Sequence, residues 1–264
     1  MVPRVVLITS NETRHKFLAN YLKKKKKIHL SLVIFEDNIK LKDNLELNSN
    51  HSLKKYVSTR NRFEKNILKE GVTINKKIKF LKVKRGEINH EFVIKKIQEK
   101  KPTHVISFGC SIINSKVIQR FKNKIFLNIH LGLSPYYAGS GTNFFPFVNN
   151  ELHFCGATLM KISKELDGGK IVHQIRPNFK INDNIHTVGN RIIKRIAQDL
   201  YKIILLKKIN FYSPEKFNTK VFRRKDFSLI TLNKALKNLK GGIIKNYLKN
   251  QNKLKKAFPI IKQI

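Results

Sequence analysis

Short runs of apolar, largely β-branched residues alternate along this chain with segments of helical periodicity, and no other feature constrains the fold as strongly. The pattern is clearest from residue 79 onward, where strand and helix alternate as 79–83, 89–101, 103–109, 115–121 and 124–130. Strands that alternate with helices indicate an α/β domain with a mainly parallel sheet. In such sheets ligands bind beyond the carboxyl ends of the strands, where loops leave the sheet. The loops at 109–113 and 131–146 are therefore the expected binding loops.

The remaining segments extend the alternation on both sides. Strands are expected at 4–8, 29–35, 154–163 and 169–179, helices at 12–24, 53–68 and 183–206, and an irregular connection at 37–52. Ser10 or Asn11 is expected to cap the helix at 12–24, and Ser115 is expected to cap the short helix at 115–121. Beyond Ser213 the sequence KVFRRKDF indicates a short strand or hairpin, and lysine-rich helical segments come after it.

The composition is that of a folded protein. Hydrophobic residues make up 41% of the 264, which is enough for one large domain or one domain with an appendage. Two cysteines, Cys110 and Cys155, do not make a disulfide framework and indicate a reducing cytoplasm. The apolar run near the N-terminus is too short for a signal peptide, and no apolar run is long enough to span a bilayer. A soluble, cytoplasmic protein is expected.

Positive charge dominates the polar residues. Fifty-five Lys and Arg against 17 Asp and Glu give a formal net charge of +38, which taken alone suggests nucleic acid or another anionic partner. The excess is mostly lysine, spread over the whole chain beside abundant Ile and Asn, as an AT-rich genome would produce. The lysine runs at 23–27 and 249–256 are not interleaved with the aromatic residues that single-strand binding uses. Compositional bias and capture of polyanionic small molecules both stay open as interpretations.

Asn128 and His130 end the last strand of the central stretch, directly before the long loop. Because side-chain direction alternates along a strand, the two side chains lie on the same side of it. Asp167 precedes two glycines, in a turn that lets backbone approach a ligand closely. Each of the three residues could simply cap a strand or stabilise a turn. Alternatively, they converge on one cleft.

The segments that carry these residues resemble a known enzyme family, whereas P-loop, paired-cysteine and HExxH motifs do not occur. NIHLGLSPYYAGSGTNFFP followed by GATLMKISKELDGGKIV is similar to the signature of formyltransferases that use 10-formyltetrahydrofolate. That signature is Asn-x-His, a loop rich in Pro, Tyr and Gly, and a later Asp-x-Gly turn. The family includes glycinamide ribonucleotide, methionyl-tRNA and bacterial sugar N-formyltransferases. With VISFGCSII, the similarity covers residues 103–174.

The resemblance implies a fold, a co-substrate and a class of partner. The fold is the α/β, Rossmann-like formyltransferase fold, with a catalytic domain over 1–210 and a small C-terminal extension over 211–264. The co-substrate is 10-formyltetrahydrofolate, and no metal is required. The partner is a small-molecule amine, without a membrane or a specific nucleic acid, and a homodimer is left open.

Carried over residue by residue, the family's catalytic Asn, His and Asp are Asn128, His130 and Asp167. A primary amine attacks the formyl carbon, and negative charge develops on the formyl oxygen. The amide of Asn128 can donate a hydrogen bond to that oxygen. His130 can stabilise the oxygen or carry the proton of the amine, and Asp167 can orient His130 and assist proton removal.

The same resemblance assigns the binding residues. Two loops are expected to line the folate pocket, through Phe108, Gly109, Ser111, Ile112, Leu166, Gly168 and Gly169. The long loop is expected to contact the amine substrate, through Tyr136, Tyr137, Gly139 and Asn143.

Departures from the family pattern narrow the substrate. The tRNA enzyme usually has Tyr-Arg-Gly where this chain has Tyr-Ala-Gly, with Ala138 in the middle, and it carries a β-barrel domain that the residues after Ser213 can hardly supply. The first strand is followed by TSNETRHKF in place of a glycine-rich turn. These features favour formyl transfer to a nucleotide-linked amino sugar. The alternatives are methionyl-tRNA or glycinamide ribonucleotide as the amine, or a non-enzymatic RNA-binding protein on the same scaffold.

Overall fold

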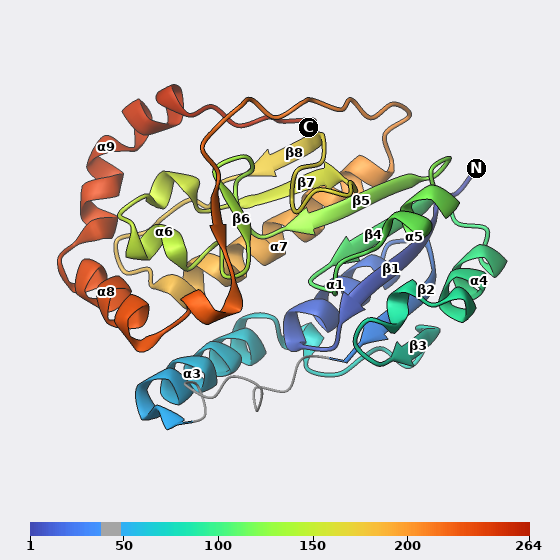
Figure 1. The fold of residues 1–264 in the computed structure, drawn as a ribbon, viewed down its shortest axis with the longest axis horizontal. Coiled ribbons are helices and arrows are strands. Elements are labelled where there is room, and N and C mark those ends of the chain that lie inside the picture. The colour runs from blue at the N-terminus through green and yellow to red at the C-terminus, as the bar shows by residue number, and fades with distance from the viewer. Residues whose placement is uncertain (38–48) are drawn as a thin grey trace.

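A seven-stranded sheet in the order β3-β2-β1-β4-β5-β7-β8 forms the centre of the computed structural model, which describes residues 1–37 and 49–264 (Figure 1). Its strands are β1 (Arg4–Ser10), β2 (His29–Glu36), β3 (Phe80–Val83), β4 (His104–Phe108), β5 (Ile125–His130), β7 (Ala157–Lys161) and β8 (Ile171–Ile175). The neighbouring pairs from β3 to β5 are parallel, whereas β7 is antiparallel to both β5 and β8. The predicted α/β fold with a mainly parallel sheet is confirmed.

Helices cover both faces of this sheet. The described ones before residue 205 are α1 (Thr13–Lys23), α3 (His51–Ile67), α4 (Glu91–Glu99), α5 (Ser115–Arg120), α6 (Phe145–Val148) and α7 (Ile185–Ile204). One core cluster contains buried residues of α1, α3 and α7, and a second one contains those of α4 and α5. The sheet is thus the middle layer of three.

Strand β1 shows why the sheet is buried on both faces. Val5 and Leu7 belong to the first core cluster, and Val6 and Ile8 to the second, and all four side chains are fully buried. A strand whose residues are apolar without interruption has no face for solvent, and this is the pattern of a parallel sheet covered on both sides. Each buried side chain of this size contributes about 1.5–3 kcal/mol to folding.

Two helices have N-cap residues other than the expected ones. Helix α1 begins after Glu12, whose backbone N–H donates to His15 Nδ1 at 3.3 Å. Ser10 is still part of β1, and its hydroxyl donates to the Gly109 carbonyl at 2.6 Å. Helix α5 is capped by Asn114 rather than by Ser115, because the Asn114 side chain accepts the N–H of residue 117 at 3.0 Å.

The C-terminal segment packs on the rest of the chain. It contains β9 (Lys220–Phe222), α8 (Leu229–Lys240) and α9 (Ile243–Ala257), which confirms the expected short strand and helices. β9 pairs in parallel with β6 (Tyr137–Gly139), so the alternative of a hairpin is wrong. Buried residues of α8 and α9, among them Leu232 and Tyr247, belong to the same core cluster as α1 and α7. A domain boundary at 210/211 stays a prediction.

The predicted connection at 37–52 falls largely on residues 38–48, outside the described residues. The helix expected at 53–68 is confirmed as α3.

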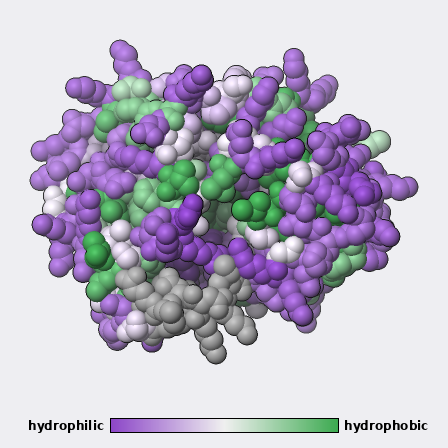
Figure 2. Space-filling view, in the orientation of Figure 1, coloured by the Kyte–Doolittle hydropathy of each residue, from purple (hydrophilic) through white to green (hydrophobic). Residues whose placement is uncertain are grey.

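Hydrophilic residues cover most of the face seen in Figure 2. Within residues 1–37 and 49–264, no helix combines the length and the apolar content that a membrane crossing needs.

Candidate active site

Strand β5 presents two polar side chains at the carboxyl end of the parallel sheet. Leu127 and Ile129 point into the first core cluster, and Asn128 and His130 lie on the opposite side of the strand, as the alternation of side chains requires. His130 is 5% exposed and Asn128 is half-buried. A polar pair is thus held at the edge of an apolar sheet, where loops leave it.

The loop between β7 and β8 returns along β5 and brings Asp167 to this pair. Its Oδ2 lies 3.2 Å from His130 Nδ1, and its Oδ1 accepts a hydrogen bond from Asn128 Nδ2 at 3.4 Å. The Asp167 side chain is 10% exposed. The structure therefore brings together the three residues predicted to be catalytic. Their catalytic roles stay a prediction.

Backbone groups of β6 complete the surroundings of His130 and Asp167. His130 Nε2 lies 2.8 Å from the carbonyl oxygen of Tyr137, and because a carbonyl can only accept, this ring nitrogen carries a hydrogen. The N–H of Gly139 donates to Asp167 Oδ2 at 2.9 Å. With Nε2 protonated, Nδ1 is the ring nitrogen that faces the carboxylate. The pair is arranged to share or move a proton between Nδ1 and Oδ2.

Ser107 on β4 orients the amide of Asn128. Its hydroxyl donates to Asn128 Oδ1 at 2.9 Å, and its side chain is almost fully buried. The carbonyl end of the amide is therefore occupied, and the NH₂ end faces Asp167. The sequence signal for Ser107 is a polar residue inside an otherwise apolar strand.

The Asp167 turn has a conformation that few residues adopt. Asp167 has φ of +49°, and its carbonyl accepts a hydrogen bond from the Ser134 hydroxyl at 3.1 Å. At Gly169 a Cβ would lie 1.8 Å from the carbonyl oxygen of Lys161, so only glycine fits there. The turn is thus fixed by a close backbone approach on one side and a hydrogen bond on the other.

The loop after β4 is held by a buried carboxylate that the sequence reasoning missed. Glu36 is fully buried at the end of β2. It accepts hydrogen bonds from the Ser111 N–H at 2.6 Å, from the Ser111 hydroxyl at 2.5 Å and from the Gly86 N–H at 2.7 Å. The N–H and the hydroxyl of Ser111 therefore both bind Glu36, which fixes the loop. The cofactor contact expected of Ser111 stays a prediction.

The other residues of the two predicted cofactor loops divide into buried and exposed groups. Phe108 is buried and makes an edge contact with His15. Gly109 has φ of +63°, and a Cβ there would lie 2.5 Å from His15 Nε2. Ile112 and Leu166 are 76% and 55% exposed. One large apolar side chain on each loop is thus open to solvent.

His15 is a second residue that the sequence reasoning passed over. Burial, and then the positive charges of Arg14 and Arg60, hold the pKa of His15 well below its usual value. The imidazole beside Phe108 and Gly109 is therefore neutral.

Three of the four predicted substrate contacts have side chains that turn inward. Tyr136 stacks on Phe154 at 4.1 Å. Tyr137 is buried, with its hydroxyl bonded to the Glu151 carboxylate, and Asn143 Oδ1 accepts the N–H of residue 156 at 2.9 Å. Of the four, only Gly139 lies at the His130–Asp167 pair, together with the backbone carbonyl of Tyr137.

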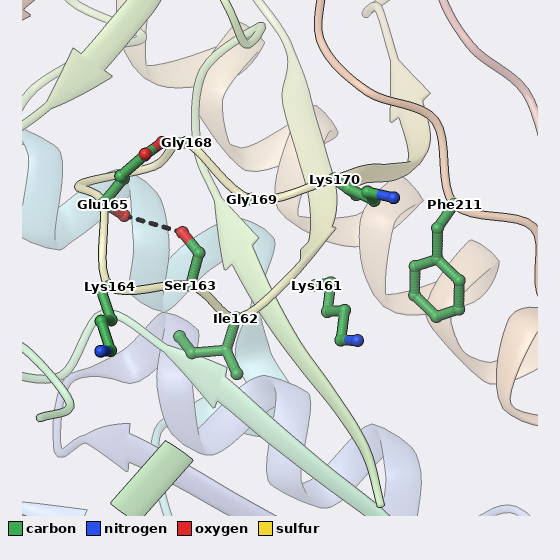
Figure 3. Close-up of a pocket in the computed structure, with 9 residues that line it drawn as sticks. All are labelled: Lys161, Ile162, Ser163, Lys164, Glu165, Gly168, Gly169, Lys170 and Phe211. Atoms are coloured by element: carbon green, nitrogen blue, oxygen red, sulfur yellow. Dashed lines mark hydrogen bonds between the residues drawn. The ribbon is translucent and has the colours of Figure 1, made fainter. Parts of the chain in front are cut away.

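A pocket of about 430 Å³ lies at the β7–β8 loop and Phe211 (Figure 3). It is lined by Lys161, Ile162, Ser163, Lys164, Glu165, Gly168, Gly169, Lys170 and Phe211. Three lysines against one glutamate give it a positive charge. None of Asn128, His130 and Asp167 lines it, so it adjoins the polar cluster without containing it. In the described part of the chain, no group of three or more His, Cys, Asp or Glu side chains could hold a metal ion.

Comparison with known proteins shows the family. A family model described as formyl transferase matches residues 4–204, a segment that contains β1 to α7 and all three residues of the polar cluster. The chain belongs to the formyl transferase family. This confirms the resemblance seen in the Asn-x-His and Asp-Gly-Gly segments.

The relatives described here share little of their sequence with this chain. Methionyl-tRNA formyltransferase from Finegoldia magna is 27% identical over 124 residues, 44% of this chain and 39% of that protein. The match covers about two fifths of the length of the curated relatives. Two solved structures share the fold. Phosphoribosylglycinamide formyltransferase from Anaplasma phagocytophilum has a TM-score of 0.55 and 19% identity, over 84% of this chain and 99% of that chain. A sugar 3-N-formyltransferase solved with dTDP and 5-formyl-tetrahydrofolate has a TM-score of 0.55 and 18% identity, over 90% and 80%.

Replacing Glu36 with alanine should destabilise the protein by about 2 kcal/mol or more, because a hydrogen bond to a charged group contributes roughly 1.5–3 kcal/mol. The free energy of unfolding in urea measures the effect. Glu99→Ala is the control, since this exposed glutamate pairs with Lys96 at the surface and its replacement should cost less than about 1 kcal/mol. Equal losses in the two variants would show that Glu36 does not hold the loop.

Proposed function

We propose that this formyl transferase moves the formyl group of 10-formyltetrahydrofolate to the primary amine of a nucleotide-linked amino sugar. The observation that carries the proposal is the convergence of Asn128, His130 and Asp167 at the carboxyl edge of the sheet. A chain that only binds a partner has no need of an amide, an imidazole and a carboxylate arranged in this way.

Asn128 supplies the donor for a carbonyl oxygen that gains negative charge. Its amide is held by Ser107 with the NH₂ group directed toward the reaction space. An oriented donor in a partly buried site stabilises developing charge without reorganising, and loss of one such donor typically costs about 100- to 1,000-fold in rate. Asn128 is therefore the residue for the formyl oxygen.

His130 and Asp167 handle the proton of the amine. An amine that attacks the formyl carbon must lose a proton, and the bond from that carbon to N10 of the folate must break, with N10 taking up a proton as tetrahydrofolate leaves. The facing atoms Nδ1 and Oδ2, 3.2 Å apart, provide a carboxylate that accepts this proton and an imidazole that holds it. The Tyr137 carbonyl keeps the ring in one tautomer, so that Nδ1 is the nitrogen available for this exchange.

The two loops beside the polar cluster suit a flat, partly apolar ligand. A bound 10-formyltetrahydrofolate would supply the formyl carbonyl that the amine attacks. Ile112 and Leu166 would cover its apolar surface, since large hydrophobic side chains this exposed are available for a ligand. Backbone of Gly109, Gly168 and Gly169 would lie along its edge. The folate derivative in the solved sugar 3-N-formyltransferase supports the choice of ligand.

An amino sugar is favoured over tRNA by the residue in the middle of β6. Ala138 stands where the tRNA enzyme is expected to carry arginine, and it is 4% exposed between its neighbours on β6. The sugar enzyme matches 90% of this chain and the purine enzyme 84%.

Glycinamide ribonucleotide and methionyl-tRNA are the alternative amines. The net charge of +38 suggests a further alternative, an RNA-binding protein without activity. With Cys110 and Cys155 both free, we expect the reaction to take place in the cytoplasm.

His130→Ala and Asp167→Ala should each abolish formyl transfer, and Asn128→Ala should lower kcat by about 100-fold or more. The measurement is turnover of 10-formyltetrahydrofolate with the amine substrate. His173→Ala is a matched control, because His173 Nε2 also lies 3.3 Å from the oxygen of a buried carboxylate, that of Asp199 on helix α7. Assayed below its unfolding temperature, this variant should keep turnover. Rates close to that of the unmodified chain in all three test variants would contradict the assignment.

Ile112→Asn and Leu166→Asn should each weaken folate binding by about 10-fold or more, because burial of a large apolar side chain contributes roughly 1.5–3 kcal/mol. Calorimetry with 5-formyl-tetrahydrofolate measures the affinity without turnover. Ile230→Asn is the control, since Ile230 is 81% exposed but lies on α8. The same affinity in all variants would remove these loops from the folate site.

Formylation of charged initiator tRNA, compared with a panel of nucleotide-linked amino sugars and glycinamide ribonucleotide at about 0.15 M salt, tests the choice of amine. Transfer to one of the sugars is expected. Non-specific binding to tRNA through several phosphates should fall roughly a thousandfold from low to physiological salt, because counterions compete. Efficient tRNA formylation without activity on any sugar would overturn the proposal.

A further inference from the structure

We propose that β9 of the C-terminal segment positions the catalytic pair, and that Phe222 is the positioning residue through which it acts. The inference deepens the proposed function and rests on it for its kinetic consequences. It assigns a role to residues 211–264, which lie beyond the segment that the family model matches.

Strand β9 is the hydrogen-bonded neighbour of β6. The Lys220 N–H donates to the Tyr136 carbonyl at 2.9 Å, and the Ser140 N–H donates to the Phe222 carbonyl at 2.8 Å. In this two-stranded sheet Phe222 is paired with Gly139. The two hydrogen bonds thus hold β6 at both of its ends.

Side chains of β9 reinforce this pairing. The Phe222 ring stacks on Phe145 with centroids 3.8 Å apart and planes 8° from parallel, and it stacks on Tyr137 at 5.5 Å. Lys220 Nζ lies 2.5 Å from Glu151 Oε1, and the same carboxylate accepts the Tyr137 hydroxyl. Aromatic pairs in such geometry contribute about 0.5–1.5 kcal/mol beyond their buried area. β9 is therefore fixed against the segment that follows His130.

Strand β6 carries both backbone contacts of the catalytic pair. The Tyr137 carbonyl accepts from His130 Nε2, and the Gly139 N–H donates to Asp167 Oδ2. Both groups belong to the main chain, so their placement depends on where β6 lies and not on which side chains it has. At Gly139 a Cβ would lie 2.1 Å from the Phe222 carbonyl oxygen, so the two strands meet at a distance that only glycine allows.

The consequence is a chain of contacts from the C-terminal segment to the imidazole. If β9 moves away, β6 loses one hydrogen-bonded side and its stacked ring. The Tyr137 carbonyl then no longer selects the tautomer with hydrogen on Nε2, and Asp167 loses a donor. A shift of about 1 Å in a catalytic group can lower the rate on the order of 100-fold.

The test is Phe222→Ala in the full chain, with two readouts. We expect kcat to fall by about 10- to 100-fold, while the affinity for 5-formyl-tetrahydrofolate changes by less than about twofold, because the hydrogen bonds and ring contacts of β9 are with β6, Phe145 and Glu151. Independently of turnover, ¹⁵N NMR of the histidine rings, with the His130 signals identified from their loss in His130→Gln, should show Nε2 protonated in the unmodified chain. In Phe222→Ala the ring should exchange between both tautomers.

Val221→Ala is the matched control, since Val221 is the preceding residue of β9 but is 54% exposed on its other side. It should leave both readouts unchanged. Phe222→Leu keeps most of the side-chain volume without the stacked ring. It should give a smaller change in kcat and in the His130 signals in the same direction. This variant tests the inference if Phe222→Ala does not fold. Unchanged His130 signals in a folded Phe222 variant would overturn the inference. Absence of formyl transfer in the unmodified chain would instead overturn the proposed function and leave the NMR result valid.

Discussion

The contact between His130 Nδ1 and Asp167 Oδ2 is the interaction on which the arrangement of the site depends. To make it, the loop after β7 must turn back along β5, and Asp167 must adopt a φ of +49°. The turn is possible because Gly169 lets the chain pass close to Lys161. The opposite side of the ring requires β6 within hydrogen-bonding distance, and β6 in turn is paired with β9. One contact thus links β5, β6, the β7–β8 loop and β9.

Charge in this molecule is divided between the interior and the surface. Several of the 17 acidic residues are buried and hydrogen-bonded, as Glu36, Glu64 and Asp199 are. No lysine within residues 1–37 and 49–264 is buried, so the surface is even more basic than the composition suggests. Such a field draws anions toward the protein, but at physiological salt it is screened beyond about 8 Å. It therefore assists capture of an anionic substrate without selecting one.

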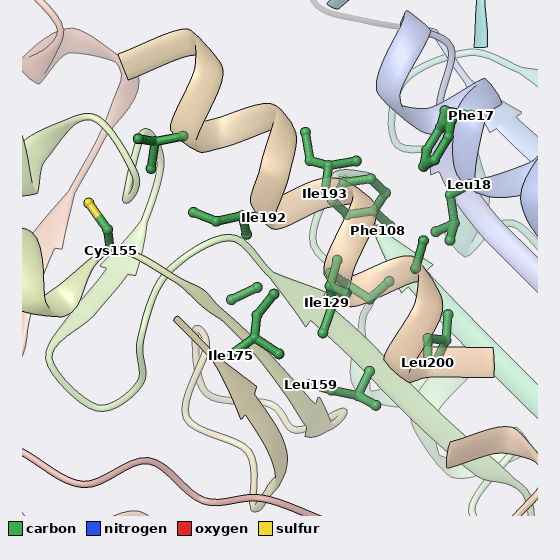
Figure 4. Packing of buried hydrophobic residues seen from close by; sticks show 14 of the residues in the cluster. Phe17, Leu18, Phe108, Ile129, Cys155, Leu159, Ile175, Ile192, Ile193 and Leu200 are labelled. Carbon is green, nitrogen blue, oxygen red and sulfur yellow. The ribbon is translucent and has the colours of Figure 1, made fainter. Parts of the chain in front are cut away.

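The core shows why the family fold tolerates a diverged sequence. Figure 4 shows Ile129 and Leu159 of the sheet beside Ile192, Ile193 and Leu200 of α7, joined only by non-directional apolar contacts. Burial stabilises such a layer according to the area removed from water, so other apolar residues of similar size would serve. The polar cluster has no such freedom, because each of its contacts needs a donor or an acceptor at one position.

The sequence by itself determined the layers and the three polar residues of the site. Apolar periodicity depends only on neighbouring residues, and Asn128 and His130 must share one side of a strand wherever that strand lies. Only the tertiary structure decided that Glu36 holds Ser111, that Tyr137 offers its carbonyl while its ring is buried, and that Phe222 pairs with Gly139. The Glu36–Ser111 and Phe222–Gly139 contacts join residues far apart in the chain, and all three contacts use main-chain groups. Main-chain groups are nearly the same in every residue, so no residue type in the sequence indicates where such contacts form.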